Sequence, residues 1–194
     1  MRMPFDSAFY IASPFGYRVD PITFESNVWH GGVDLVSDDT RIRAVVAGTV
    51  LQSRIVEDKN NRTWEWGNYV SVAGRDGKVT YYCHMETRAV EAGQYVQEGQ
   101  LLGIEGSTGR STGRHLHFEL RDGAGNQLNP CAYIGIPNIK GFEYEPPKAD
   151  DAHWWDEALA WGVENGITDG TNPDGQATRA MVITMLKRYH DRFF

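Results

Sequence analysis

The chain has 194 residues and a formal net charge of −7, and this length suits one domain of about 135 residues with a small appendage. The negative charge argues against nucleic acid or an anionic membrane surface as a partner. No apolar run approaches the roughly 20 residues of a membrane span. The N-terminal F-Y-I-A is interrupted at once by Ser13-Pro14, so we also expect no signal peptide in this chain.

Glycine is abundant, at 21 of 194 residues, and the middle of the chain resembles short strands separated by turns. Residues 42–51 predict a pair of buried strands. Residues 68–73 and 78–85 flank R-D-G, which is a hairpin signature, and residues 94–104 predict another hairpin-like piece. The pattern therefore predicts a mainly β domain, in which a glycine-rich antiparallel β-sheet takes a barrel-like form.

The character of the chain changes after this first domain, for which we expect residues 1–136. Residues 137–149 are rich in proline and lack periodicity, so they predict a linker. Residues 150–194 predict a small C-terminal helical hairpin, whose first helix carries a stripe of tryptophans. Thr178 is placed to cap the second helix, which runs to the chain end. The simplest interpretation of this hairpin is a stabilising appendage.

Four of the histidines and one aspartate lie in three short segments. His30 and Asp34 lie in W-H-G-G-V-D-L, His84 lies in Y-Y-C-H-M, and His115 and His117 lie in R-H-L-H-F-E-L. The two glycines between the first pair disfavour a helix and suit a tight loop that brings both side chains to one point. Two histidines and a carboxylate, with further histidines to spare, are what a hydrolytic zinc site requires.

Side chains two apart on a strand share a face, so His115, His117 and Glu119 are predicted to point into one groove. The same alternation predicts that His84 lies on the face of Tyr82, opposite Cys83. Catalytic zinc takes three protein ligands and leaves one position open, a set that one member of the H-x-H pair completes. The other member and the histidine of the Y-Y-C-H-M segment are then left for acid–base work.

Weaker interpretations compete with a zinc site. A lone H-x-H is more often an ordinary polar face, and a single histidine is structural by default. The conjunction of three glycine-flanked segments changes this balance, whereas His153 and His190 lack such a context and are interpreted as surface or packing residues. A biotinyl or lipoyl scaffold is weakly suggested by G-x-x-V-x-x-G-x-x-L-G. That scaffold needs a lysine at a hairpin tip, and the middle of the chain has only Lys59 and Lys78.

The motifs H-G-G-V-D, Y-x-H and S-T-G-R-S-T-G-R-H-L-H-F-E, with S-P-F-G-Y-R-V-D-P upstream, resemble the M23 (lysostaphin/LytM-type) peptidoglycan endopeptidases. The resemblance covers roughly residues 12–135. It implies that His30, Asp34 and His117 bind one zinc ion and that His84 and His115 are catalytic. It also implies peptidoglycan as the substrate. The alternative is a non-catalytic wall-binding or amidase-activating member of the same fold, which is favoured only where one of these residues is missing.

The C-terminal W-x-x-x-A-L-x-W-x-x-x-x-G-I-T-D-G followed by A-T-R-A resembles one S-layer-homology (SLH) repeat. The resemblance implies a secondary cell-wall polysaccharide as a partner, with Arg179 as the candidate contact. A wall-degrading enzyme without an export signal needs another route to its substrate. We therefore expect either an endolysin that leaves the cytoplasm through holin lesions or a trimmed secreted form such as an autolysin.

Overall fold

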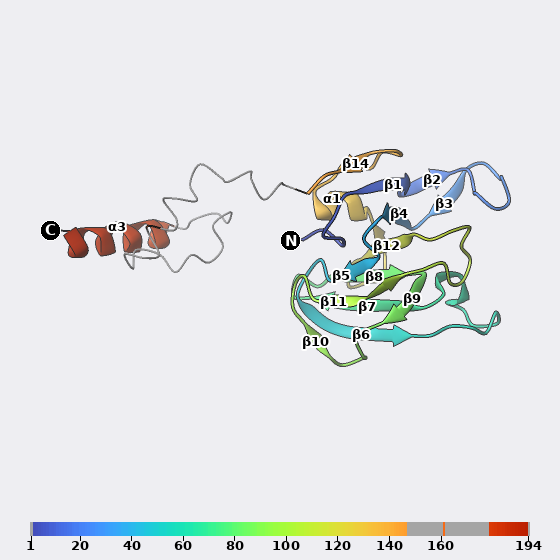
Figure 1. The fold of residues 1–194 in the computed structure, drawn as a ribbon, viewed down its shortest axis with the longest axis horizontal. Coiled ribbons are helices and arrows are strands. Elements are labelled where there is room, and N and C mark those ends of the chain that lie inside the picture. Colours follow the sequence, from blue (N-terminus) through green and yellow to red (C-terminus); the bar gives the residue numbers. More distant parts are fainter. Residues whose placement is uncertain (1, 147–160, 162–178, 194) are drawn as a thin grey trace. The chain divides into compact units, whose positions relative to one another are not determined.

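The computed structural model describes residues 2–146, 161 and 179–193. The chain divides into two compact units, Met1–Pro146 and Pro147–Phe194. The first unit is built almost entirely of antiparallel strands (Figure 1). The predicted mainly β fold with antiparallel sheets is thereby confirmed.

A nine-stranded sheet forms the frame of the first unit. In their order across the sheet, eight of its strands are β10 (Tyr95–Val96), β6 (Gly48–Arg54), β7 (Tyr69–Gly74), β8 (Val79–Cys83), β12 (Leu116–Arg121), β4 (Gly32–Ser37), β1 (Phe9–Ser13) and β14 (Glu143–Tyr144). The ninth strand, β13 (Gln127–Leu128), pairs with β12. The strands that carry Asp34 and His117, β4 and β12, are therefore direct neighbours near the middle of the sheet.

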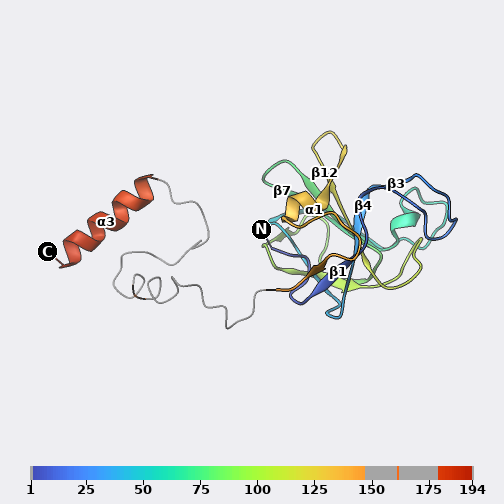
Figure 2. The ribbon, with the colours of Figure 1, turned by 90° about the horizontal axis from the view of Figure 1, so that it is seen from above.

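Smaller elements complete the unit. They are the three-stranded sheet β5 (Arg41–Arg43), β11 (Leu101–Glu105) and β9 (Met85–Arg88), the two-stranded sheet β2 (Gly16–Arg18) and β3 (Val28–His30), the 3-10 helix η1 (Trp64–Trp66) and the helix α1 (Pro130–Ile134). Helix α1 packs against β4 and β12 (Figure 2). It begins where the side chain of Asn129 accepts the N–H of Cys131 at 3.0 Å, and it ends at the left-handed Gly135.

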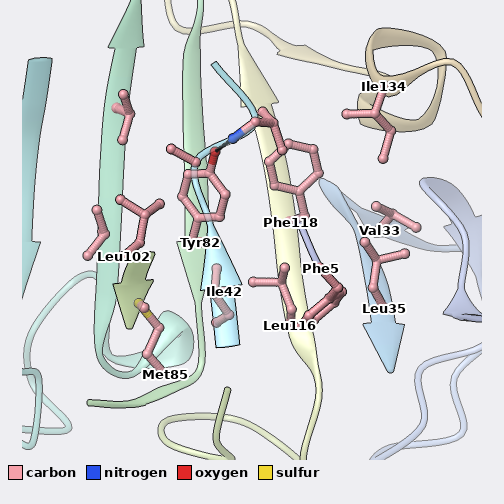
Figure 3. Packing of buried hydrophobic residues seen from close by; sticks show 14 of the residues in the cluster. Phe5, Val33, Leu35, Ile42, Tyr82, Met85, Leu102, Leu116, Phe118 and Ile134 are labelled. Atoms are coloured by element: carbon pink, nitrogen blue, oxygen red, sulfur yellow. Dashed lines mark hydrogen bonds between the residues drawn. The ribbon is translucent and has the colours of Figure 1, made fainter. Parts of the chain in front are cut away.

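The hydrophobic core lies on one face of the central strands. Leu116 and Phe118 of β12 point to the same side, next to Tyr82 of β8 (Figure 3), and all three side chains are fully buried. The hydroxyl of Tyr82 accepts the backbone N–H of Val45 at 2.9 Å, so the one polar atom of this ring is satisfied inside the core. Burial of each such side chain stabilises the fold by about 1.5–3 kcal/mol, which fixes the opposite face of β12 as the one that bears His117.

One of the two predicted hairpins is confirmed and the other is wrong. Strands β7 and β8 pair directly on either side of R-D-G. The 94–104 segment does not pair with itself, because β10 joins β6 whereas β11 joins β5 and β9. The turn residues there connect two sheets.

The second unit is described through Trp161 and α3 (Arg179–Phe193). The remainder of the first predicted helix, His153 and the capping residue Thr178 lie outside the described residues. His190 is exposed on α3. None of the helices in the described ranges combines the length and the apolar character that crossing a membrane requires.

Glu105, at the end of β11, carries a buried carboxylate. Its Oε2 pairs with Arg114, whose guanidinium also donates to the Ser37 carbonyl at 2.9 Å. No hydrogen-bond partner reaches its Oε1 among the residues that the structure describes. Burial raises the pKa of Glu105 to about 7, even though Arg114 opposes that change.

A carboxyl group whose pKa is higher in the folded than in the unfolded state lowers the free energy of unfolding as the pH rises, because the buried group must then ionise. From its ordinary pKa of 4.5 to about 7, Glu105 is expected to remove up to roughly 3 kcal/mol of stability. In Glu105→Gln this loss is absent, so the free energy of unfolding of the wild type relative to the variant falls between pH 4.5 and pH 8. Urea unfolding across this range measures it, with the exposed Glu86→Gln as control. A difference that stays constant with pH contradicts the prediction.

Candidate metal centre and catalytic cleft

His30, Asp34 and His117 meet at one point because three strands deliver them there. In the antiparallel pairing of β4 with β12, Asp34 lies directly opposite His117. His30 ends β3, and only Gly31 separates it from β4. The predicted tight loop between His30 and Asp34 is therefore wrong, since both residues lie in extended strands that belong to different sheets.

The two glycines serve close packing here. A Cβ at Gly32 would lie 2.7 Å from the His117 ring and 2.6 Å from the Phe118 carbonyl. A Cβ at Gly31 would lie 1.9 Å from Nε2 of Gln127. Neither position has space for a side chain, so glycine lets the imidazole of His117 lie directly against β4.

The three donor atoms form a compact triangle. His30 Nε2 lies 3.1 Å from both Asp34 Oδ1 and His117 Nδ1, and His117 Nδ1 lies 2.9 Å from Asp34 Oδ1. The residues are only 5%, 8% and 8% exposed. A tetrahedral zinc ion with bonds of about 2.0–2.1 Å separates its ligand atoms by roughly 3.3 Å. Two imidazole nitrogens and one carboxylate oxygen at these separations fit such an ion.

The surroundings orient these donors and favour positive charge between them. His30 Nδ1 donates to the Pro14 carbonyl at 2.8 Å, which leaves the Nε2 lone pair facing the triangle. Burial opposes charge on Asp34 and His117, but the hydrogen bonds and charge attractions that each makes with its neighbours together outweigh it. The pKa of Asp34 is held well below its usual range, and that of His117 is raised to about 9. A cation is therefore stabilised where these atoms converge.

His84 and His115 lie beside the triangle, with their ring centroids 4.6 Å apart. His84 Nδ1 donates to the Thr108 carbonyl at 2.7 Å, and His115 Nδ1 donates to the Gly113 carbonyl at 2.8 Å. In each ring this bond leaves the Nε2 lone pair available, and His115 Nε2 lies 3.6 Å from Asp34 Oδ1. The structure thus brings all five sequence-predicted site residues together.

The predicted alternation around His84 is wrong in one respect. Strand β8 ends at Cys83, and His84 takes a φ of 62° in the left-handed region. Its ring therefore leaves the core face of Tyr82 and lies 5.8 Å from the His117 ring. Burial, together with the neighbouring imidazoles, lowers the pKa of His84 to about 3. The ring is therefore neutral near pH 7.

An open cleft of about 480 Å³ gives access to this centre. The segment 20–25 and the loop 110–112 form two of its walls. A bidentate ion pair joins these walls, because Arg110 Nη2 lies 3.0 and 2.9 Å from the two carboxylate oxygens of Asp20. Asp20 also accepts backbone N–H groups of its own loop, and these bonds, with Arg110, keep its pKa far below its ordinary value despite burial.

Sequence reasoning missed several residues that support the centre. Arg18 Nη1 donates to Asp34 Oδ2 at 3.3 Å and to Ser13 Oγ at 2.7 Å. Glu119, correctly predicted on the face of His117, had no assigned role, although its Oε2 lies 3.8 Å from His117 Nε2. The carbonyl acceptors of His84 and His115 carry no sequence signal, because any residue supplies a backbone oxygen. Arg179 begins α3, and its side chain lies outside the description.

Curated relatives carry closely similar sequences over this part of the chain. The "DD-carboxypeptidase/endopeptidase Mpg" of Neisseria meningitidis is 37% identical over 130 residues, which are 66% of this chain and 27% of that protein. The "Peptidoglycan DD-endopeptidase ShyA" of Vibrio cholerae is 36% identical over 121 residues, 61% of this chain and 26% of that protein. The chain thus spans about a quarter of the length of the curated relatives it matches.

Solved structures show the same fold. The catalytic domain of the prophage-encoded M23 protein EnpA from Enterococcus faecalis, solved as a point mutant, is 30% identical with a TM-score of 0.54, covering 66% of this chain and 94% of that one. The catalytic domain of lysostaphin from Staphylococcus simulans is 26% identical with a TM-score of 0.53, covering 66% and 91%. The family model "Peptidase family M23" matches residues 28–130, more than half of the chain. The chain therefore belongs to peptidase family M23.

Proposed function

We propose that the chain is a zinc-dependent endopeptidase that hydrolyses peptide bonds in bacterial peptidoglycan. The observation that carries this proposal is the convergence of His30, Asp34 and His117 at 2.9–3.1 Å, next to His84 and His115. A non-catalytic member of the fold has no need of this complete set. The names of the relatives, a peptidoglycan DD-endopeptidase among them, support peptidoglycan as the substrate.

The mechanism follows from where the protons lie. Zinc in such a site supplies a Lewis acid and lowers the pKa of bound water toward about 7. In the neutral form of His84 and of His115, the Nδ1–H is held by a backbone carbonyl, so Nε2 is the ring atom with a lone pair. One of them accepts the proton of the attacking water, and the imidazolium formed in this way hydrogen-bonds the developing oxyanion or donates that same proton to the leaving amine.

The substrate bond we propose lies in the stem peptide or the cross-bridge of peptidoglycan. The cleft is open and lined largely by polar side chains, which suits an extended peptide. The likeness to a prophage-encoded M23 protein supports an endolysin role, and a trimmed secreted form is the alternative. In either setting we propose that the enzyme acts at the cell wall.

Removal of the metal tests the proposed function directly. The purified protein is expected to carry about one zinc ion per chain, because the triangle offers three ligands to a single ion. A strong chelator is expected to abolish turbidity loss in a suspension of cell walls, and added zinc to restore it. Metal analysis and turbidity are measured on the same samples. Wall lysis that continues at full rate after the zinc has been removed contradicts the proposal.

We further propose that a wall-binding segment follows the peptidase domain. Strand β14 (Glu143–Tyr144) pairs with β1, and the first compact unit extends to Pro146, so we place the end of the peptidase domain there. Residues 147–194 are proposed to bind a secondary wall polysaccharide, through the SLH-like pattern and Arg179.

A truncated chain tests this division. Residues 1–146 are expected to fold, bind zinc and cleave soluble peptidoglycan peptides as the full chain does, because every proposed ligand lies within them. On intact walls their sedimentation with the wall and their lysis rate are expected to fall. If the truncated chain binds walls as well as the full chain does, residues 147–194 do not bind the wall, and the interpretation as a stabilising appendage replaces the proposal.

A further inference from the structure

Glu119 lies behind the metal centre and is almost completely buried, at 1% exposure. Its Oε2 faces His117 Nε2 at 3.8 Å, on the side of the ring away from the donor triangle. Its Oε1 accepts Arg121 Nε at 2.6 Å and Gln127 Nε2 at 2.8 Å. A carboxylate behind a ligating histidine favours the ring orientation that turns its N–H toward the carboxylate, so the contacts that hold Glu119 in place also bear on the orientation of His117.

Gln127 lies between the two ligand-bearing segments. It occupies β13, opposite Arg121 of β12, and its amide fills the space that a Cβ at Gly31 would need. The side next to Gly31 is the side of the neighbouring ligand, His30. The Gln127 amide therefore packs against Gly31, next to the ligand His30, and also donates a hydrogen bond to Glu119, the carboxylate behind the ligand His117.

The other end of this amide reaches the cleft. Trp29 Nε1 donates to Gln127 Oε1 at 2.7 Å. The indole is 47% exposed and lines the cleft wall. Only one orientation of the amide satisfies both neighbours, because the indole is a pure donor and the carboxylate a pure acceptor. A directed chain of contacts thus runs from Trp29 through Gln127 and Glu119 to His117.

We propose that Gln127 is a positioning residue that couples the cleft-wall indole of Trp29 to the metal ligand His117. It acts through Glu119 and supplies no donor atom to the triangle, although it also lines the cleft. Loss of its amide leaves the Glu119 carboxylate with the Arg121 hydrogen bond on Oε1, and the His117 ring loses part of its support. The indole of Trp29 also loses the acceptor that sets its angle toward the cleft. This inference rests on the proposed zinc peptidase function.

The test compares zinc affinity in purified full-length variants. Gln127→Leu keeps the approximate volume and removes both hydrogen bonds, so the dissociation constant for zinc, measured by competition with a chromophoric chelator, is expected to rise about 10–100-fold. The matched control is Gln52→Leu on β6. Gln52 does not line the cleft, and its side-chain amide accepts a hydrogen bond from the Tyr69 hydroxyl. In the cobalt-substituted protein, the visible ligand-field bands are expected to change for Gln127→Leu and not for Gln52→Leu.

A double-variant cycle tests the direction of coupling. Trp29→Phe removes the indole N–H and keeps an aromatic ring, and it is expected to weaken zinc binding less than Gln127→Leu does. If Trp29 acts through Gln127, the double variant binds zinc no more weakly than Gln127→Leu alone. Wild-type zinc affinity in Gln127→Leu, or fully additive effects in the double variant, overturns this inference while the wild type still lyses walls. A wild type that binds no zinc overturns the proposed function as well.

Discussion

Replacement of His30, Asp34 or His117 by alanine is expected to leave the protein without bound zinc and without wall-lysing activity. Each donor atom lies within 3.1 Å of the other two, so all three are placed to bind one ion together. A catalytic zinc site with three protein ligands keeps its fourth position for the reaction. A site reduced to two ligands loses the ion, and with it the chemistry that the ion supplies.

The three variants remove different groups from the site, and this difference allows a sharper test. His30→Ala and His117→Ala remove imidazole donors, whereas Asp34→Ala removes the one carboxylate of the triangle and also the acceptor of Arg18. Metal analysis and the turbidity assay are made on the same preparations, with circular dichroism as the check on folding. The exposed Asp38→Ala, just beyond the end of β4, is the matched control for Asp34→Ala. Full zinc occupancy in any one variant removes that residue from the ligand set.

The strand pattern around the H-x-H pair could be predicted because β12 is a regular strand with a paired neighbour on each side. In such a strand, side chains alternate between the two faces of the sheet. Leu116 and Phe118 therefore enter the core, and His117 and Glu119 lie on the opposite face. The hairpin at R-D-G was predictable for a similar reason, since the turn residues alone fix its pairing. The local sequence is therefore sufficient to predict the orientation of side chains and the pairing of strands where the local structure is regular.

Prediction failed where a distant neighbour decides the conformation. Gly31 and Gly32 were interpreted as turn residues, but they are required because Gln127 and His117, far along the chain, occupy the space of a side chain. The left-handed φ of His84 interrupts the alternation of β8 within one residue. Segment 94–104 has good hairpin residues, yet its strands find better partners in β6 and β5. None of these contacts is encoded in a local pattern.

Replacement of His84 or His115 by alanine is expected to separate catalysis from metal binding. Neither residue contributes a donor atom to the triangle, so both variants are expected to keep about one zinc ion per chain. Their lysis rates are expected to fall by a factor on the order of 10²–10⁴, the range for a lost acid–base group. Zinc content and lysis rate, measured on the same preparations, decide between the two roles.

The two histidines are also expected to differ from each other. The His84 ring is buried at 5% exposure, and its anchor is the carbonyl of Thr108. His84→Ala therefore opens a cavity and is expected to lower the melting temperature as well as the activity. His115 is only half-buried and lies at the cleft rim, so His115→Ala is expected to lose activity with little change in stability. If His115→Ala came out metal-free while His117→Ala retained zinc, the roles within the H-x-H pair would be exchanged. That result would require His115 Nε2, now 3.6 Å from Asp34 Oδ1, to move into the place that His117 Nδ1 occupies at 2.9 Å.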